Sequence, residues 1–311
     1  NESLYGNTLA TTDFEGFIDM SESIFDVYDC PDEDVTEGWV DIDEEVEVDF
    51  SYGVGDLCTI TDDVWVSPDG DDYLNTGTSE SNAFLTIETA LALIAPDSLN
   101  TITVNLTEGT FSPSTTGENF PIVMISNVNL IGQGEEVTII DAEQSGRVIM
   151  MENCDNNTIS DITITGGLAE GDYPDSSGGG MFLDFSNPIL TNVTISNNTA
   201  DDGGGMYLSY SDPILTNSII WDNLPESIYS IGVTEPIITY SNIEGGWEGE
   251  GNIDMNPLFT DPENGDYSLQ EGSPCIDAGT SYFESSLGEI IVDIPDSSYY
   301  GSAPDMGAFE F

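Results

Sequence analysis

The chain has 311 residues, of which 60 are Asp or Glu, one is Arg and none is Lys or His, so its formal net charge is −59. Nucleic-acid binding and polybasic membrane contacts need many Lys and Arg side chains, and Arg147 alone cannot provide them. The lack of His argues against Ser-His-Asp triads and haem sites, and we expect neither haem nor a nucleotide as cofactor. No apolar run approaches the roughly 20 residues of a membrane helix, so we expect no membrane insertion. The hydrophobic fraction of 38% is ordinary for a globular protein, which predicts an acidic surface over a packed core.

Residues 1–60 are expected to form a small β-rich appendage. Within them, residues 39–52 read WVDIDEEVEVDFSY and alternate apolar and acidic side chains, which indicates a β-strand with one face in water. Such a strand could add to a sheet edge of a neighbouring molecule, so the appendage is a candidate assembly segment.

The four cysteines form no C-x-x-C motif, and without His the usual zinc sites are excluded. Cys30 and Cys58 both lie in the appendage, and the sequence is equally compatible with a disulfide between them and with two free thiols. Cys154 and Cys275 lie in apolar contexts and are predicted to be buried thiols.

Residues 82–95 are predicted to form an amphipathic helix. Phe84, Ile87, Leu91 and Ile94 recur at helical spacing on one face, and a proline follows the last of them. We expect this helix to cover the end of the structure that the following residues build, because an exposed sheet edge invites pairing with other chains.

Residues 178–223 contain the same sequence pattern twice. Met181 aligns with Met206 and Leu190 with Leu215, at an interval of 25 residues, and a degraded third copy follows in EPIITYSNI. Each copy holds short Ile-, Val- and Thr-rich segments between Gly, Asn and Asp. A period in the twenties built from strands and turns indicates a solenoid, in which stacked coils bury a common core. The fold class predicted is therefore all-β, a parallel β-helix.

The strand ILTNVTI divides its side chains between two faces. Ile189, Thr191, Val193 and Ile195 share one strand parity, and Leu190, Asn192 and Thr194 share the other. We also expect Asn192 and Asn217 to stack in successive coils and to bond through their amides.

The repeats, the segment VWVSPDGDDYLNTGTSESNAFLTIETALALI (64–94), and the closing segments NPLFTDPENGDYSLQEGSPCIDAG (256–279) and APDMGAFEF (303–311) resemble secreted right-handed parallel β-helix surface proteins of the choice-of-anchor and polymorphic outer-membrane-protein-repeat type. The resemblance implies a right-handed helix over residues 61–311, with an N-terminal cap at 61–100 and a C-terminal cap at 256–311. Members are exported and often carry a sorting segment, which we expect to be absent or already removed here. This chain departs from its relatives at Leu85, where a basic residue is usual.

The acidic charge needs a counter-charge. Coils lie about 4.8 Å apart, and two stacked carboxylates at that distance repel by roughly 0.9 kcal/mol even in water. Salt, acid or calcium could offset this repulsion. The candidate calcium ligands lie in two glycine-containing turns, although Asp, Asn and Gly are also common turn formers without any metal. These candidates are Asp69, Asp71, Asp72, Asp261, Glu263, Asn264 and Asp266.

The function predicted is structural rather than enzymatic. Polysaccharide lyases with the fold implied by the resemblance use Arg or Lys as base, and Arg147 alone cannot both bind a uronate and abstract its proton. We expect an extracellular or bacterial cell-surface protein, a self-associating fibre or matrix subunit or an adhesin, stabilised by cations. The alternative is a carbohydrate-binding or glycoside hydrolase-like protein, since two carboxylates suffice for hydrolysis and Trp65, Trp221 and Trp247 could stack on neutral glycans.

Overall fold

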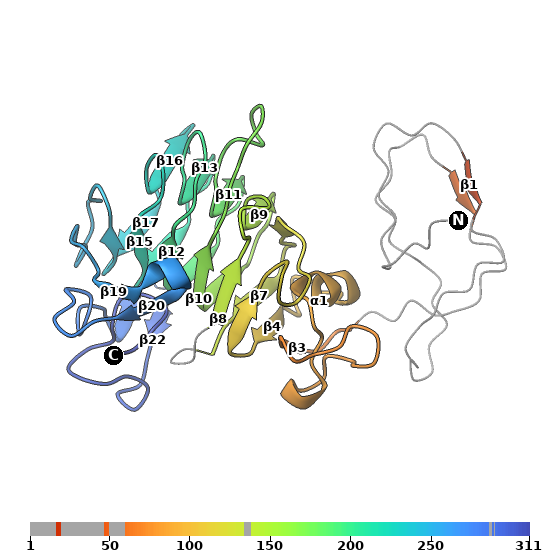
Figure 1. Ribbon diagram of the computed structural model, residues 1–311, viewed down its shortest axis with the longest axis horizontal. Helices are drawn as coiled ribbons and strands as arrows, with labels where there is room; N and C mark the ends of the chain where they lie inside the picture. The colour runs from red at the N-terminus through yellow and green to blue at the C-terminus, as the bar shows by residue number, and fades with distance from the viewer. Residues whose placement is uncertain (1–16, 20–46, 50–59, 134–137, 286–287, 289) are drawn as a thin grey trace.

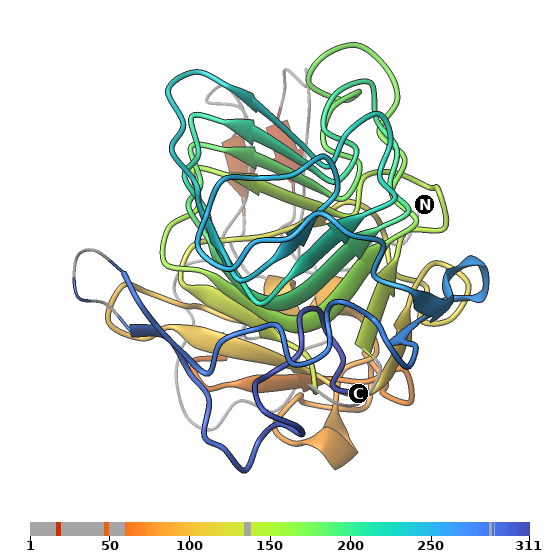
Figure 2. The same ribbon diagram turned by 90° about the vertical axis from the view of Figure 1, so that its left-hand side faces the viewer.

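The computed structural model describes residues 17–19, 47–49, 60–133, 138–285, 288 and 290–311. Most of these residues form a parallel β-helix whose coils follow one another along the long axis of Figure 1. Viewed along that axis in Figure 2, successive coils overlie each other. No helix in the described part of the chain is long and apolar enough to cross a membrane.

The coils contribute strands to three parallel sheets, which we call sheets A, B and C. Sheet A contains β3 (Val64–Val66), β4 (Ile102–Leu106), β7 (Val128–Ile131), the first halves of β10 (Thr158–Thr165) and β12 (Ile189–Ser196), β14 (Ile214–Thr216) and β17 (Ile237–Thr239). Sheet B contains β5 (Gly109–Phe111), β8 (Thr138–Asp141), the second halves of β10 and β12, β15 (Ile219–Trp221) and β18 (Asn242–Ile243). Sheet C contains β6 (Ile122–Val123), β9 (Ile149–Glu152), β11 (Met181–Asp184), β13 (Met206–Ser209) and β16 (Ile228–Ile231).

The predicted repeat is confirmed by the strand register. Met181 pairs with Met206 and Leu190 pairs with Leu215, so one repeat corresponds to one coil. The degraded copy also forms a coil, with Ile237 paired to Ile214.

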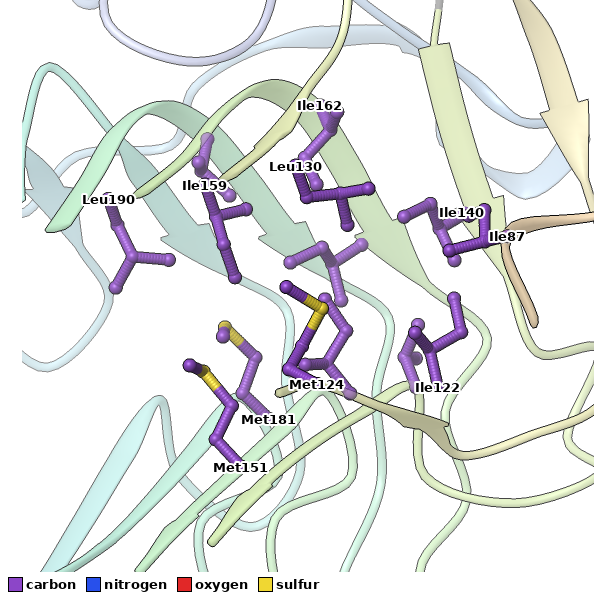
Figure 3. Packing of buried hydrophobic residues seen from close by; sticks show 14 of the residues in the cluster. Ile87, Ile122, Met124, Leu130, Ile140, Met151, Ile159, Ile162, Met181 and Leu190 are labelled. Atoms are coloured by element: carbon purple, nitrogen blue, oxygen red, sulfur yellow. The ribbon is translucent and has the colours of Figure 1, made fainter. Parts of the chain in front are cut away.

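The core is a set of aliphatic columns that run through the coils. On sheet A the column contains Val104, Leu130, Ile159, Leu190, Leu215 and Ile238, none more than 3% exposed. On sheet B it contains Phe111, Ile140, Ile164, Ile195, Ile220 and Ile243. Ile122, Met151 and Met181 of sheet C close the third side (Figure 3). Each such side chain stabilises the fold by roughly 2 kcal/mol, and only stacked coils provide that burial.

The predicted strand parity is wrong at one point, which is the corner between sheets A and B. The core residues of β12 are Leu190, Val193 and Ile195, so the parity changes at Asn192. Asn192 has a φ of 53°, in the left-handed region, and Asp161 and Asn217 occupy the same corner in neighbouring coils with φ values of 59° and 52°. A residue in this conformation turns the chain by one step, and Asn and Asp tolerate it better than most residues.

The helix predicted at 82–95 is shorter than expected. Helix α1 spans Ile87–Leu93 and follows the short 3-10 helix η1 (Glu80–Asn82). Phe84 is extended and forms a bridge with Val66 of β3, which prevents an earlier helix start. Helix α1 contacts β3, β4 and β6 at the start of the solenoid, as the predicted end cover requires.

The closing segment differs from the C-terminal cap predicted at 256–311. Ile253 pairs with Asn242 at the end of the last coil, so residues before 256 begin the cover there. The chain then leads back along the side of the solenoid in two hairpins. The first contains β19 (Phe259–Asp261), η2 (Pro262–Asn264) and β20 (Asp266–Leu269), and the second contains β21 (Tyr282–Glu284) and β22 (Ile290–Asp293). The Tyr267 hydroxyl bonds Thr165 at 2.6 Å, and the Ala308 N–H bonds the Thr194 hydroxyl at 3.1 Å, so this segment covers the outer face of sheet B.

The predicted appendage is described only in two short strands. β1 (Phe17–Asp19) and β2 (Glu47–Asp49) pair in parallel, and β2 lies within the strand predicted at 39–52. Cys30 and Cys58 lie outside the described residues. Cys154 and Cys275 are free and buried, as predicted.

Candidate functional site

Backbone N–H groups take the place of cationic side chains around the start of α1. The Asp72 carboxylate accepts the N–H groups of Leu85 and Thr86 at 2.7 and 3.1 Å. The Glu118 carboxylate accepts those of Ile87 and Glu88 at 2.8 and 2.9 Å. Two carboxylates therefore bind four N–H groups around the start of α1, where the helix dipole is positive.

Glu118 is the most deeply buried of these carboxyl groups, with 2% of its surface exposed. Burial raises its pKa to about 7, although the two backbone hydrogen bonds act in the opposite direction. The negative charges of Glu88 and Asp72 add to the increase. Glu118 is therefore poised to take up or release a proton near neutral pH.

In the first turn predicted to bind calcium, the carboxylates of Asp71 and Asp72 accept hydrogen bonds from the protein. Asp71 Oδ1 accepts the N–H groups of Tyr73 and Leu74 at 2.8 and 3.0 Å. Among the described residues, no three His, Cys, Asp or Glu side chains are gathered closely enough to hold a metal ion. Calcium binding at this turn stays a prediction.

The second predicted calcium turn lies in the β19–β20 hairpin. Asp261 accepts a hydrogen bond from the Asn264 amide at 2.8 Å, and Asp266 accepts from the backbone and hydroxyl of Ser268. Asp261 and Asp266 are cross-strand partners. The side chain of Glu263 lies outside the described set, and calcium at this hairpin also stays a prediction.

Arg147 is buried between Phe182 of sheet C and the loop that contains Pro174, with 5% of its surface exposed. Its guanidinium lies 4.5 Å from the centre of the Phe182 ring and donates a hydrogen bond to the Pro174 carbonyl at 2.5 Å. Burial lowers the pKa of Arg147, while the negative charges of Asp175 and Glu152 raise it. The sole cationic side chain thus holds the 168–178 loop against the sheet and presents no charge to the outer surface.

Aromatic residues form two stacks on the outside of sheet C. Phe182, Tyr207 and Tyr229 stack with ring centres 5.4 and 5.5 Å apart, and Phe185 stacks on Tyr210 at 5.0 Å. The ring faces that contact one another within each stack are not available to a sugar. The three tryptophans proposed for glycan stacking, Trp65, Trp221 and Trp247, are all partly buried, and Trp221 and Trp247 pack against the core.

A cavity of about 510 Å³ lies between the corner of sheets A and B and the C-terminal segment. Its lining consists of Gly132, Gln133, Asp161, Asn192, Ile294, Ser298, Gly307, Ala308, Phe309 and Glu310. The Asn192 amide donates a hydrogen bond to Asp161 Oδ1 at 2.9 Å, while Asn192 Oδ1 is buried and has no partner. Burial raises the pKa of Asp161, against the effect of hydrogen bonds from Asn192 and Ser160.

The asparagines expected to bond to each other between coils do not do so. Asn192 bonds Asp161, and the Asn217 amide bonds the backbone of Thr280. The asparagine ladder lies at Asn198 and Asn223, where both the backbone N–H and the amide of Asn198 donate to Asn223 Oδ1. These two residues share the same 25-residue interval, so the repeat itself carried the signal.

Comparison with known families agrees with this architecture. Residues 121–251 match the family model described as the right handed beta helix region. That stretch runs from β6 to the end of the coils, and it supports the right-handed sense implied by the resemblance. Residues 69–147 match the model of a protein of unknown function, DUF1565, and this stretch contains α1 and strands β4 to β8. No curated protein and no solved structure matches the chain.

Proposed function

We propose that the protein is an extracellular or cell-surface structural protein, a rigid solenoid that serves as a fibre or matrix subunit or as an adhesin. The observation that supports this proposal is the unbroken set of aliphatic columns through the coils. Such a core gives a stiff body whose length scales with the number of coils. Arg147, the only cationic side chain of the sequence, binds the Pro174 carbonyl and the Phe182 ring inside the protein and does not face a substrate site.

If the protein associates with copies of itself, as proposed, the association requires bound cations. Two molecules of net charge −59 repel each other, and no outward Lys, Arg or His exists to form ion pairs between them. Divalent cations that bridge carboxylates of two copies would remove this repulsion, whereas monovalent salt only screens it.

Electron microscopy of negatively stained protein at neutral pH tests the proposal. We expect fibres or ordered arrays in millimolar calcium chloride, their loss on adding a chelator, and none in sodium chloride of matched ionic strength. Single particles under all three conditions would refute cation-bridged polymerisation. Fibres that ignore the chelator would mean that assembly rests on strand exchange or packing, and a chain lacking residues 1–60 would then show whether the appendage carries it.

A carbohydrate-binding or glycoside hydrolase-like function is the alternative, and the cavity beside Asp161 and Glu310 is the observation that favours it. Two carboxyl groups beside an apolar wall are a common composition for a sugar site. Incubation with neutral oligosaccharides, followed by measurement of new reducing ends and of bound sugar, distinguishes this function from the structural one.

A further inference from the structure

The floor of the cavity is the corner column of the solenoid. Gly132, Asp161, Asn192 and Asn217 occupy equivalent corner positions in successive coils, as the register of their strands shows. Gly132 has no side chain, and a Cβ atom there would meet the Asp161 carbonyl oxygen at 1.9 Å. The Asp161 backbone therefore packs directly against Gly132, and the cavity lining at this corner includes Gly132, Asp161 and Asn192.

At the corner residue of the next coil, Asn217, the side-chain amide has hydrogen-bond partners for both its oxygen and its nitrogen. Asn217 accepts the N–H of Thr280 and donates to its carbonyl, both at 2.8 Å, because the C-terminal segment passes over it. At the next corner residue, Asn192, residues 307–310 of the C-terminal segment line the cavity. Asn192 keeps only its bond to Asp161, and its Oδ1 atom is left without a donor.

The cavity is rich in acceptors and poor in positive charge. Asp161 and Glu310 both line it, and Arg147, the only cationic side chain in the sequence, is buried behind sheet C. The net charge of −59 adds a negative potential over the whole surface, which concentrates cations and repels anions. Ile294 and Phe309 supply an apolar wall beside these acceptors.

We propose that this cavity binds a small organic cation, with an ammonium group at the Asp161 carboxylate and its hydrocarbon part against Ile294 and Phe309. The volume of about 510 Å³ exceeds what one metal ion needs and suits a ligand of several carbon atoms. An ammonium group carries three donors and the charge that the site lacks. Anionic and purely apolar ligands are disfavoured by the same groups.

Two probes with the same carbon skeleton test the charge requirement. 1,4-Diaminobutane carries ammonium groups, and 1,4-butanediol replaces them with neutral hydroxyls. In NMR titrations at pH 7 and physiological salt, we expect diaminobutane to shift the backbone amides of Gln133, Phe309 and Glu310 in a saturable manner. The diol should leave them unchanged. Equal responses to both probes, or no response to the diamine, would overturn the proposal.

Two variants separate the cavity from the general acidity of the surface. Asp161→Asn removes the carboxylate and keeps a residue that favours the φ of 59°, so the fold should persist. Asp201→Asn removes an exposed carboxylate away from the cavity lining. We expect diaminobutane affinity at the cavity amides to fall about tenfold in the first variant and to stay unchanged in the second. An equal effect of both variants would reveal a diffuse ion atmosphere and refute a site.

Proton linkage gives a readout that needs no variant. Burial raises the pKa of Asp161, so an ammonium ion that favours the ionised carboxylate should displace a proton at mildly acidic pH. The apparent affinity at the cavity amides should therefore weaken as the pH is lowered. Affinity that is independent of pH from 4 to 7 would contradict the assigned role of Asp161. Calcium chloride that produces the same saturable shifts would assign the cavity to a metal ion and would also overturn the proposal.

Discussion

Replacing Glu118 by glutamine should change how the stability of the protein depends on pH. The unfolded chain releases the Glu118 proton near pH 4.5, and the folded chain keeps it to about pH 7. Between these values the folded state binds more protons than the unfolded state, so rising pH lowers the free energy of unfolding. The loss is complete once the pH has passed about 7.

The magnitude follows from the size of the shift. A change from 4.5 to about 7 corresponds to about 3 kcal/mol, at roughly 1.4 kcal/mol per pKa unit. Glu118→Gln cannot ionise and should lose this component of the pH dependence. Glutamine has one acceptor oxygen for the N–H groups of Ile87 and Glu88, so we expect a pH-independent penalty of about 1–2 kcal/mol as well.

Urea unfolding from pH 4.5 to 8, followed by circular dichroism, measures the effect. The remaining acidic residues also titrate over this range, so the control is Glu108→Gln, which removes an exposed carboxyl group. We expect wild type and Glu108→Gln to lose stability in parallel as the pH rises. Glu118→Gln should be less stable than wild type at pH 4.5 and equal or more stable at pH 8. Parallel curves for all three proteins, within about 0.5 kcal/mol, would refute the assignment of the proton to Glu118.

Three further predictions concern the coils. Gly180→Ala should destabilise the protein by more than about 2 kcal/mol, because the new Cβ would lie 2.6 Å from a backbone oxygen of the next coil. The control is Gly146→Ala, whose Cβ would meet nothing closer than 3.4 Å and which should be near neutral in thermal unfolding. Asn223→Ala should cost about 1–3 kcal/mol in urea unfolding, because the buried N–H of Asn198 loses its acceptor and the Ile195 carbonyl loses a donor; an unchanged midpoint would show that the ladder is dispensable. Native protein should resist trypsin until it unfolds, because Arg147 is its only cleavage site and is 5% exposed; a single cut at that bond well below the melting temperature would indicate local opening of the 168–178 loop.

The coils could be predicted from the sequence because residues one repeat apart pair with each other in neighbouring coils. Aligning Leu190 with Leu215 is already a statement about which atoms stack. The parity of β12 could not be predicted in the same way, because alternation assumes that every residue is extended. The backbone of Asn192 is in the left-handed region, and the presence of an asparagine alone does not distinguish a corner from a strand position.

The position of the closing segment and the cavity depended on contacts that no local pattern encodes. The Thr194–Ala308 hydrogen bond joins residues 114 positions apart, and the Thr165–Tyr267 bond joins residues 102 apart. Sequence analysis identified the closing segment but treated it as an end cover, because solenoid ends need protection. The apolar outer face of sheet B around Ile139 and Ile219 gave that segment another surface to bury. Asp161 became part of a candidate site only through this packing.

The arrangement of the carboxylates also changes the account of the charge. The sequence suggested many carboxylates stacked at the coil spacing, each pair repelling by roughly 0.9 kcal/mol. In the described registers of sheets A, B and C, only Glu152 and Asp184 are stacked neighbours. Several other carboxylates bind backbone N–H groups in turns. Glu152 is also one of the two carboxylates whose charge acts on Arg147. Arg147 is thus influenced by one member of the stacked acidic pair of sheet C.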